Sequence, residues 1–174
     1  EDRGHDRSPP PNRMTTFSPP IIERLSSNVY QLTSQTIVNR CLEETFEFFA
    51  RAENLNKITP PWLRFNIVSN TPIRMGIGTI IEYRLKLRGF PMKWVSEIPI
   101  WQPPHRFVDQ QKSGPYRYWR HEHLLQKHDK DSTQMKDIVT YKVPFGRFTH
   151  ALFVKRDLKK IFKHRHHSLR DLLY

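Results

Sequence analysis

Two histidines placed two positions apart, His121 and His123, are the side chains of this sequence best suited to chemistry. They lie in segment 118–125, which has the pattern of a β-strand, and residues i and i+2 of a strand face the same side. The same alternation turns Asp109 and Asp137 inward from two other predicted strands. An imidazole held by a carboxylate can act as a general base toward an acidic C–H or hydroxyl group.

Two other interpretations of these four side chains stay open. Buried polar groups need partners, so Asp109, Asp137 and the histidines could form a purely structural network. The two imidazoles, with a third ligand from Asp109 or Asp137, could instead bind Zn²⁺ or Fe²⁺. However, two histidines at this spacing arise easily by chance in a chain with nine of them. We therefore expect no metal and no other cofactor, and we assign no catalytic residue.

Aromatic and apolar side chains surround these polar groups on the inward faces of the predicted strands. The expected ligand-binding residues are Tyr83, Trp94, Phe107, Asp109, Gln111, Trp119, His121, His123, Asp137 and Tyr141. A pocket that is mostly apolar, with a few placed polar groups to orient the ligand, is typical of small-molecule binding sites.

The elements that position these residues follow from hydrophobic periodicity and turn signals. Strands are predicted over 29–38, 65–69, 79–87, 92–100, 106–111, 118–125 and 135–143. Helical spacing covers 39–50, a short helix over about 54–58 ends at Pro60-Pro61, and a long helix covers 148–173. Consecutive strands on short connections favour an antiparallel sheet. The fold class is therefore α+β, with a curved sheet around the last helix and a cavity between them.

The last helix has two predicted faces. Its apolar stripe consists of Ala151, Val154, Leu158, Ile161 and Leu169. Its opposite face is basic, and we expect His164, His166 and His167 on this solvated face. A basic amphipathic helix can contact an anionic surface or an acidic partner, although a solvated outer face is the simpler interpretation.

Residues 1–27 differ in composition from the rest of the chain. They hold five of the fourteen prolines, and their acidic and basic residues cancel. Such a segment buries too little apolar surface to offset its ordering entropy. We expect a flexible, proline-rich arm over 1–27 and one domain over 28–174.

Composition limits the class of protein. The chain has 174 residues and a net charge of +12, with 37% hydrophobic and 12% aromatic residues. One cysteine excludes a disulfide scaffold and a four-cysteine zinc site. No apolar stretch is long enough for a membrane span and no secretory signal is visible, so a cytoplasmic protein is expected.

Several motifs together resemble the START-like (SRPBCC, polyketide cyclase/dehydrase-type) ligand-binding superfamily, in particular its bacterial branch found alone or fused to an epimerase-like domain. They are FFARAENL at 48–55, ITPPWL at 58–63, MKW at 92–94, PPHRFVD at 103–109, GPY at 114–116, WRHEH at 119–123 and DIVTY at 137–141. The resemblance implies a helix-grip fold with a deep apolar pocket for a lipid-like or polycyclic ligand. It implies no single reaction, because the superfamily includes carriers, sensors and cyclases.

Three functions follow as hypotheses. The favoured one is a carrier or sensor that binds a hydrophobic small molecule or lipid between the sheet and the last helix. The second is a cyclase, dehydratase or isomerase that uses His121 or His123 with Asp109 or Asp137. The third is a basic protein that binds nucleic acid or an anionic membrane surface, and nucleic acid is the less expected of these partners.

Overall fold

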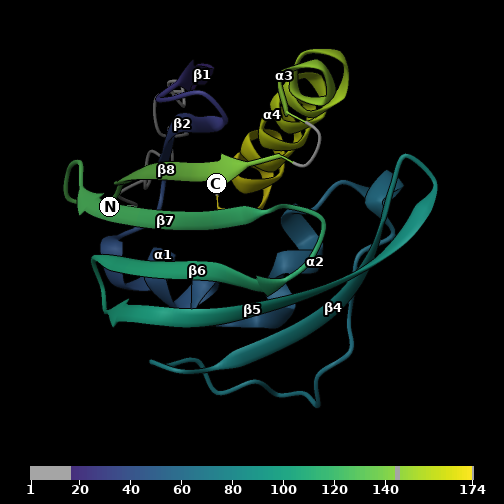
Figure 1. Ribbon diagram of the computed structural model, residues 1–174. Coiled ribbons are helices and arrows are strands. Elements are labelled where there is room, and N and C mark those ends of the chain that lie inside the picture. Colours follow the sequence, from purple (N-terminus) through teal and green to yellow (C-terminus); the bar gives the residue numbers. More distant parts are fainter. Residues whose placement is uncertain (1–16, 144–145, 174) are drawn as a thin grey trace, which may run out of the picture.

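One eight-stranded antiparallel sheet dominates the computed structural model, which describes residues 17–143 and 146–173 (Figure 1). Its strands are β1 (Phe17–Arg24), β2 (Val29–Val38), β3 (Asn66–Ile67), β4 (Ile80–Leu87), β5 (Phe90–Gln102), β6 (Arg106–Ser113), β7 (Tyr118–Lys127) and β8 (Thr133–Lys142). Their order in the sheet is β1-β2-β8-β7-β6-β5-β4-β3. Strands β3 to β8 therefore form a meander, and β2 extends the sheet by pairing with β8.

Helical segments occupy the two remaining parts of the chain. Helices α1 (Leu42–Phe49) and α2 (Leu55–Ile58) lie between β2 and β3, with short 3₁₀ turns at Ala52–Asn54 and Pro61–Leu63. The C-terminal part begins with α3 (Gly146–Thr149), continues through a π-helical turn at His150–Val154 and ends in α4 (Lys155–Leu172). The predicted α+β class and the long final helix are confirmed.

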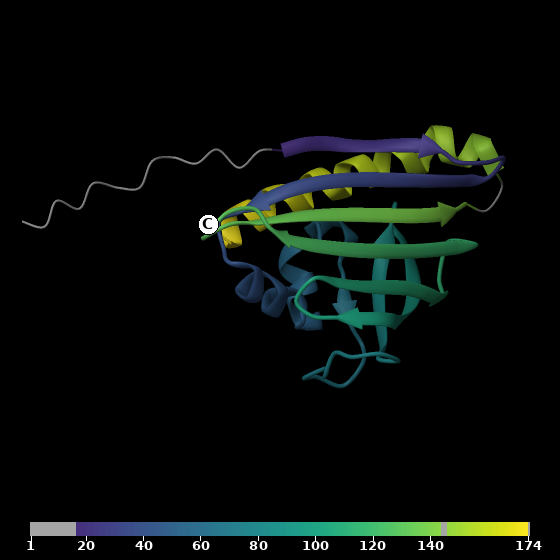
Figure 2. The same ribbon diagram turned by 90° about the vertical axis from the view of Figure 1, so that its left-hand side faces the viewer.

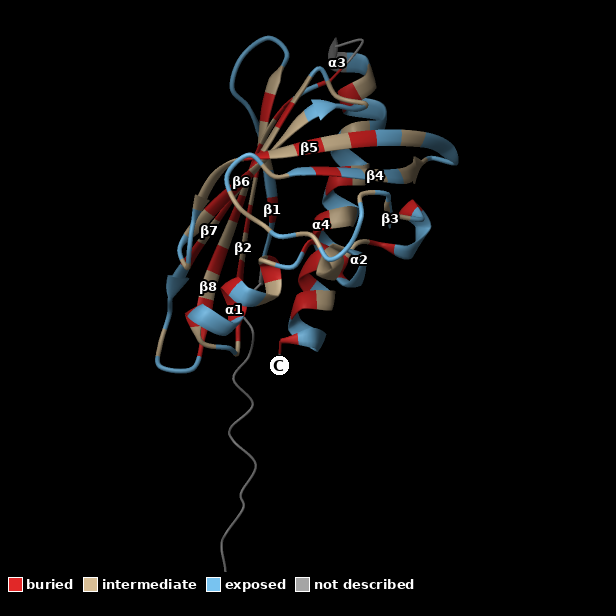
Figure 3. Ribbon diagram, turned by 90° about the horizontal axis from the view of Figure 1, so that it is seen from below, coloured by how far each residue is buried: buried red, intermediate tan, exposed pale blue. Residues whose placement is uncertain are grey.

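The sheet curves around α4. In Figure 2 the yellow C-terminal helix runs along the sheet behind its first strands. Figure 3 shows β2, β8, β7 and β6 along one side of α4, while β5 and β4 cross a different side of this helix. This arrangement is the helix-grip fold, in which the concave face of a sheet holds one long helix.

Strict alternation along the central strands sends every second side chain into the interior. In β7 the buried residues are Trp119, His121, His123 and Leu125, as the sequence predicted. In β8 they include Asp137, Val139 and Tyr141, which confirms the second predicted face. The interior thus receives aromatic rings and charged groups from the same strands.

Two apolar clusters share α4. Near its C-terminus, Leu169 packs with Phe46 and Phe49 of α1 and with Phe107. Nearer its start, Leu158 and Phe162 pack with Trp94, Trp119 and Tyr141. Arg165 lies between the two clusters on the helix, so apolar packing flanks this side chain on both sides.

The predicted arm over 1–27 is wrong for residues 17–24, because they form β1 at the edge of the sheet. Strand β1 pairs with β2, and its register shifts between Ser18 and Ile21, where Pro19 and Pro20 lie. Prolines are tolerated on an edge strand because its outer N–H groups need no partner there. Backbone pairing with β2 and packing of Ile22 against the apolar cluster around Leu158 therefore order this segment. The arm predicted over 1–16 lies outside the described residues.

Two details of the final helix also correct the prediction. His166, expected on the solvated face, is buried, and its Nδ1 lies 3.1 Å from Thr36 Oγ1 of β2. Ala151, expected in the apolar stripe, is exposed. The π-helical turn at His150–Val154 explains Ala151, because the extra residue in that turn shifts the helical phase. Leu158 and Leu169 are buried as predicted, and His167 is exposed as predicted.

Candidate functional site

Five charged or titratable side chains meet in the interior between the sheet and α4. Cross-strand pairing places Asp109 of β6 opposite His121 of β7, and His123 of β7 opposite Asp137 of β8. Arg165 reaches the same point from α4 and is 7% exposed. Three neighbouring strands and one helix therefore build a single polar cluster.

Each imidazole lies between the two carboxylates. His121 Nε2 is 3.0 Å from Asp137 Oδ1, and its Nδ1 is 3.4 Å from Asp109 Oδ2. His123 Nδ1 is 2.9 Å from Asp137 Oδ1, and its Nε2 is 3.2 Å from Asp109 Oδ2. Arg165 donates to both oxygens of Asp137, from Nε at 3.2 Å and Nη2 at 3.3 Å. Asp137 is thus the most heavily bonded member of the cluster.

The surroundings shift the pKa of both carboxyl groups in the same direction. Burial by itself raises the pKa of Asp137, but the Arg165 guanidinium and hydrogen bonds from both histidines outweigh it and hold this pKa well below its usual value. Burial likewise opposes ionisation of Asp109, but its hydrogen bond with His123 and the nearby positive charges leave its pKa lowered. Both side chains are therefore carboxylates at neutral pH.

The two histidines shift in opposite directions. Burial and the charge of His123 lower the pKa of His121. Burial also works against a proton on His123, but hydrogen bonds with Asp109 and Asp137 outweigh it and raise the pKa of His123. One proton on His123 balances the cluster, because two carboxylates then face one guanidinium and one imidazolium.

An apolar cavity of about 160 Å³ lies beside this cluster, between the sheet and α4. Its lining is mostly aromatic and aliphatic: Leu55, Ile58, Thr59, Leu63, Phe65, Tyr83, Leu85, Leu87, Trp94, Asp109, Pro115, Tyr116, Trp119, His121, Leu158, Ile161, Phe162 and Arg165. Its carboxylate, imidazole and guanidinium groups, from Asp109, His121 and Arg165, all belong to the cluster. A ligand in the cavity would therefore meet apolar walls and one polar end.

A smaller hollow of about 70 Å³ lies on the other side of the cluster. His123 and Phe107 line it together with Phe49 of α1. The rings of His123 and Phe107 are stacked, with centroids 4.1 Å apart. Four side chains border both hollows and form the wall between them: Leu55, Ile58, Asp109 and Arg165.

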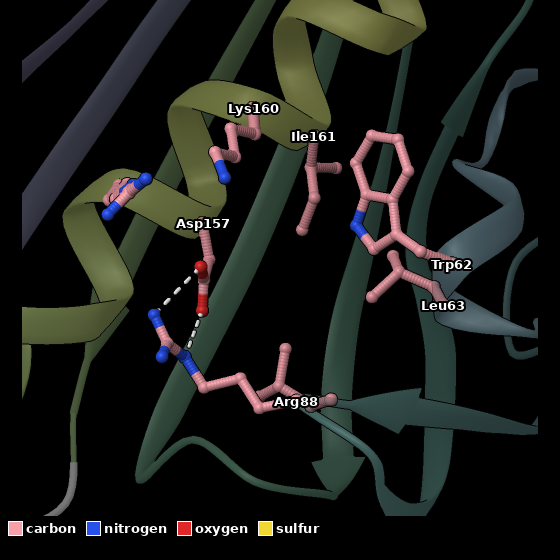
Figure 4. A pocket seen from close by; sticks show the side chains of 8 residues that line it. Trp62, Leu63, Arg88, Asp157, Lys160 and Ile161 are labelled. Carbon is pink, nitrogen blue, oxygen red and sulfur yellow. Dashed lines mark hydrogen bonds and ion pairs between the residues drawn. The ribbon is translucent and has the colours of Figure 1, made fainter.

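A groove of about 630 Å³ leads to the cavity from the surface (Figure 4). Leu63, Leu87 and Ile161 line both the groove and the cavity. Across the groove Arg88 makes two bonds to Asp157 of α4, at 2.8 and 3.0 Å. Trp62, which is 55% exposed, stands at its edge.

The groove is positively charged. Arg88, Arg156 and Lys160 line it, with Asp157 as the acidic residue among its lining side chains. Since Asp157 already pairs with Arg88, Arg156 and Lys160 are the cations left to face an incoming molecule. The mouth of the apolar cavity therefore suits an anionic group.

The structure brings together most of the sequence-predicted ligand residues, in two groups. Around the main cavity lie Tyr83, Trp94, Asp109, Trp119 and His121, and around the smaller hollow lie Phe107 and His123. Tyr83 and Trp94 are also tied by Ser96, whose Oγ lies 3.0 Å from the Tyr83 hydroxyl and accepts from Trp94 Nε1 at 3.1 Å.

Three predicted residues stand apart from the cavity walls. Asp137 is buried behind the histidines. The Tyr141 hydroxyl lies 3.0 Å from His150 Nε2, and burial raises the pKa of Tyr141 above its usual range. The Gln111 amide donates to the backbone oxygen of Tyr116 at 2.7 Å and closes the turn between β6 and β7.

Arg165 and the residues of the groove are not among the site residues predicted from the sequence. A signal for Arg165 exists, because Leu158, Phe162 and Leu169 place it at helical spacing on the buried stripe. The groove has no comparable signal. It joins the β4–β5 turn to α4, which are far apart in the sequence.

The curved sheet around α4 defines a helix-grip fold of the START-like type. Residues 78–173 match the family described as "Domain of unknown function (DUF8410)", and the chain belongs to this family. No curated protein matches the chain. The narrower resemblance to a bacterial branch found alone or fused to an epimerase-like domain stays a prediction.

Solved structures support the same fold. Ginseng major latex-like protein 151 from Panax ginseng has a TM-score of 0.63 at 10% identity, over 84% of this chain and 99% of that one. The ZhuI aromatase/cyclase from a Streptomyces species has a TM-score of 0.63 at 12% identity, over 81% and 91%. Norcoclaurine synthase from Thalictrum flavum has a TM-score of 0.60 at 16% identity, over 84% and 97%. At these identities the likeness concerns the fold alone.

Within residues 17–143 and 146–173, no helix has the length and apolar character needed to cross a membrane.

Proposed function

We propose that this protein binds a hydrophobic small molecule or lipid in the cavity between the sheet and α4, as a carrier or sensor. The observation that carries this proposal is the cavity lining. Aromatic rings from β4, β5 and β7 face Leu158 and Phe162 of α4 across it, and polar groups gather at one end. Apolar walls supply affinity through burial, and the polar end orients the ligand.

The size of the cavity limits what the ligand can be. At about 160 Å³ it is smaller than the roughly 300–1,000 Å³ of sites that enclose a drug-sized ligand. A larger ligand would therefore extend from the cavity into the groove, past Leu63, Leu87 and Ile161. Since Arg156 and Lys160 line the groove, we infer an amphipathic ligand with an apolar end inside and an anionic end at the mouth.

Native mass spectrometry of the purified chain, with and without added fatty acids, tests the proposal. We expect a 1:1 complex. The variant Leu85→Trp fills the cavity and should weaken binding at least tenfold. Leu152→Trp is the matched control, because Leu152 is a 63% exposed leucine outside the cavity. Failure to detect any complex, or equal binding by the wild type and Leu85→Trp, would contradict the proposal.

A second candidate function is an enzyme of the cyclase, dehydratase or isomerase type. It is favoured by the position of Asp109 and His121 on the cavity wall, where a proton could pass to or from a bound molecule. The test compares the molecules recovered from the wild type and from His121→Asn. An enzyme predicts that the wild type converts the molecule retained by the variant. A carrier predicts the same molecule in both.

A further inference from the structure

The buried cluster contains more electron-pair donors than hydrogens to bridge them. All four ring nitrogens of His121 and His123 lie within 3.4 Å of a carboxylate oxygen. Four N–H donors would require both rings to be protonated, and with Arg165 the buried cluster would then carry a net positive charge. With one proton on His123, the two rings supply three N–H groups for these four contacts.

Asp137 and Asp109 lie on opposite sides of the two rings. Asp137 Oδ1 accepts from His121 Nε2 at 3.0 Å and lies 2.9 Å from His123 Nδ1, which Arg165 Nη2 also approaches at 3.4 Å. His121 Nδ1 and His123 Nε2 face Asp109 Oδ2, at 3.4 and 3.2 Å, and a hydrogen bond joins Nε2 to this oxygen. A cation that took the place of this one hydrogen would meet three electron-pair donors, from Asp109 Oδ2 and the two nitrogens.

We propose that Asp109, His121 and His123 bind a divalent transition-metal ion, with Zn²⁺ as the preferred probe. Zinc holds imidazole nitrogen and carboxylate oxygen at about 2.0–2.2 Å, which places neighbouring ligand atoms about 3.0–3.4 Å apart. The two measured separations from Asp109 Oδ2 agree with this spacing. One ligand atom from each of the three side chains lies within 4.8 Å of the others.

The surroundings have the features of a prepared metal site. Histidines that bind metals usually donate their other N–H to a carboxylate, and the Asp137 carboxylate lies 3.0 and 2.9 Å from the other nitrogens of these two rings. Three protein ligands leave a coordination position open, as in catalytic zinc sites. Asp109 and His121 line the main cavity, so this position can be reached by water or by an oxygen of a bound ligand.

This inference does not depend on the ligand-binding function. It does exclude one form of the enzyme candidate, because a metal ion and a free imidazole base cannot share the lone pair of His121 Nδ1. Metal binding and ligand binding are measured separately, so failure of one leaves the other standing.

The first test titrates Zn²⁺ into the chelator-treated full chain against a coloured zinc chelator. We expect a 1:1 complex that is at least about 100-fold weaker in Asp109→Asn, since the variant loses a direct ligand. His167→Asn, which removes an exposed histidine of α4, should bind like the wild type. Cys41→Ser should do the same. The absence of a 1:1 complex, or equal affinity in Asp109→Asn, would overturn the proposal.

A second measurement needs no variant, and it decides the matter if Asp109→Asn fails to fold. X-ray absorption of the 1:1 zinc complex of the wild type should show two imidazoles and oxygen ligands at about 2.0–2.2 Å, with no sulfur. A spectrum with fewer than two imidazoles, or with a sulfur ligand, would refute the site.

Discussion

Replacement of Arg165 by leucine should be among the most destabilising single changes in the domain. Arg165 and Asp137 have side chains only 8% and 7% exposed, and the guanidinium donates to both carboxylate oxygens. Arg165→Leu leaves a buried carboxylate without its cation. Loss of one partner of a buried ion pair typically costs about 3–5 kcal/mol. That loss is a large part of the roughly 5–15 kcal/mol that keeps a domain folded.

Urea unfolding at pH 7, followed by circular dichroism, measures this loss. The matched control is Lys112→Leu, which breaks an ion pair with Glu97 whose side chains are 51% and 36% exposed. Such a surface pair contributes about 0–1 kcal/mol, so the control should be nearly silent. Adding Asp137→Asn to Arg165→Leu should recover part of the stability, because it removes the stranded charge. A loss of stability in Arg165→Leu no greater than that of the control would contradict this prediction.

Three further perturbations have defined outcomes. Burial and the charges of His167 and Arg170 lower the pKa of His166 to about 4. The unfolded chain, in which the pKa of this histidine is about 6.5, therefore takes up a proton first as the pH falls. The stability contributed by neutral His166 is complete above pH 6.5 and is lost between about pH 6.5 and 4. His166→Gln should reduce this pH dependence in urea titrations. Ser96→Ala removes a partner of the Tyr83 hydroxyl and of a buried indole N–H and should lower the free energy of unfolding by about 1–3 kcal/mol. Arg156→Glu should weaken binding of fatty acids but not of the corresponding alcohols, as measured by calorimetry.

The inward faces of the central strands could be predicted because a strand has a fixed period of two. Trp119, His121 and His123 had to share a face once the strand was recognised, and the burial of β7 follows that pattern. Asp109 and Asp137 could be placed inward by the same argument. Their exact pairing could not, because it depends on the register between strands.

Other features depend on contacts that no local pattern reports. Strand β1 is ordered by backbone pairing with β2, although the composition of residues 1–27 suggests disorder. The π-helical turn changes the phase of the last helix, so Ala151 turns outward. Arg165 lies on the predictable stripe, but its role as the cation for Asp137 appears only when the helix is laid on the sheet.

A crystal structure of the chain with a bound fatty acid tests ligand binding in the cavity most directly. We expect an acyl chain against Trp94, Trp119 and Phe162, with the carboxylate near Arg156 and Lys160 at the mouth of the groove. In a crystal soaked to saturation with the fatty acid, a ligand found only on the outer surface and touching none of these three rings would contradict ligand binding in the cavity.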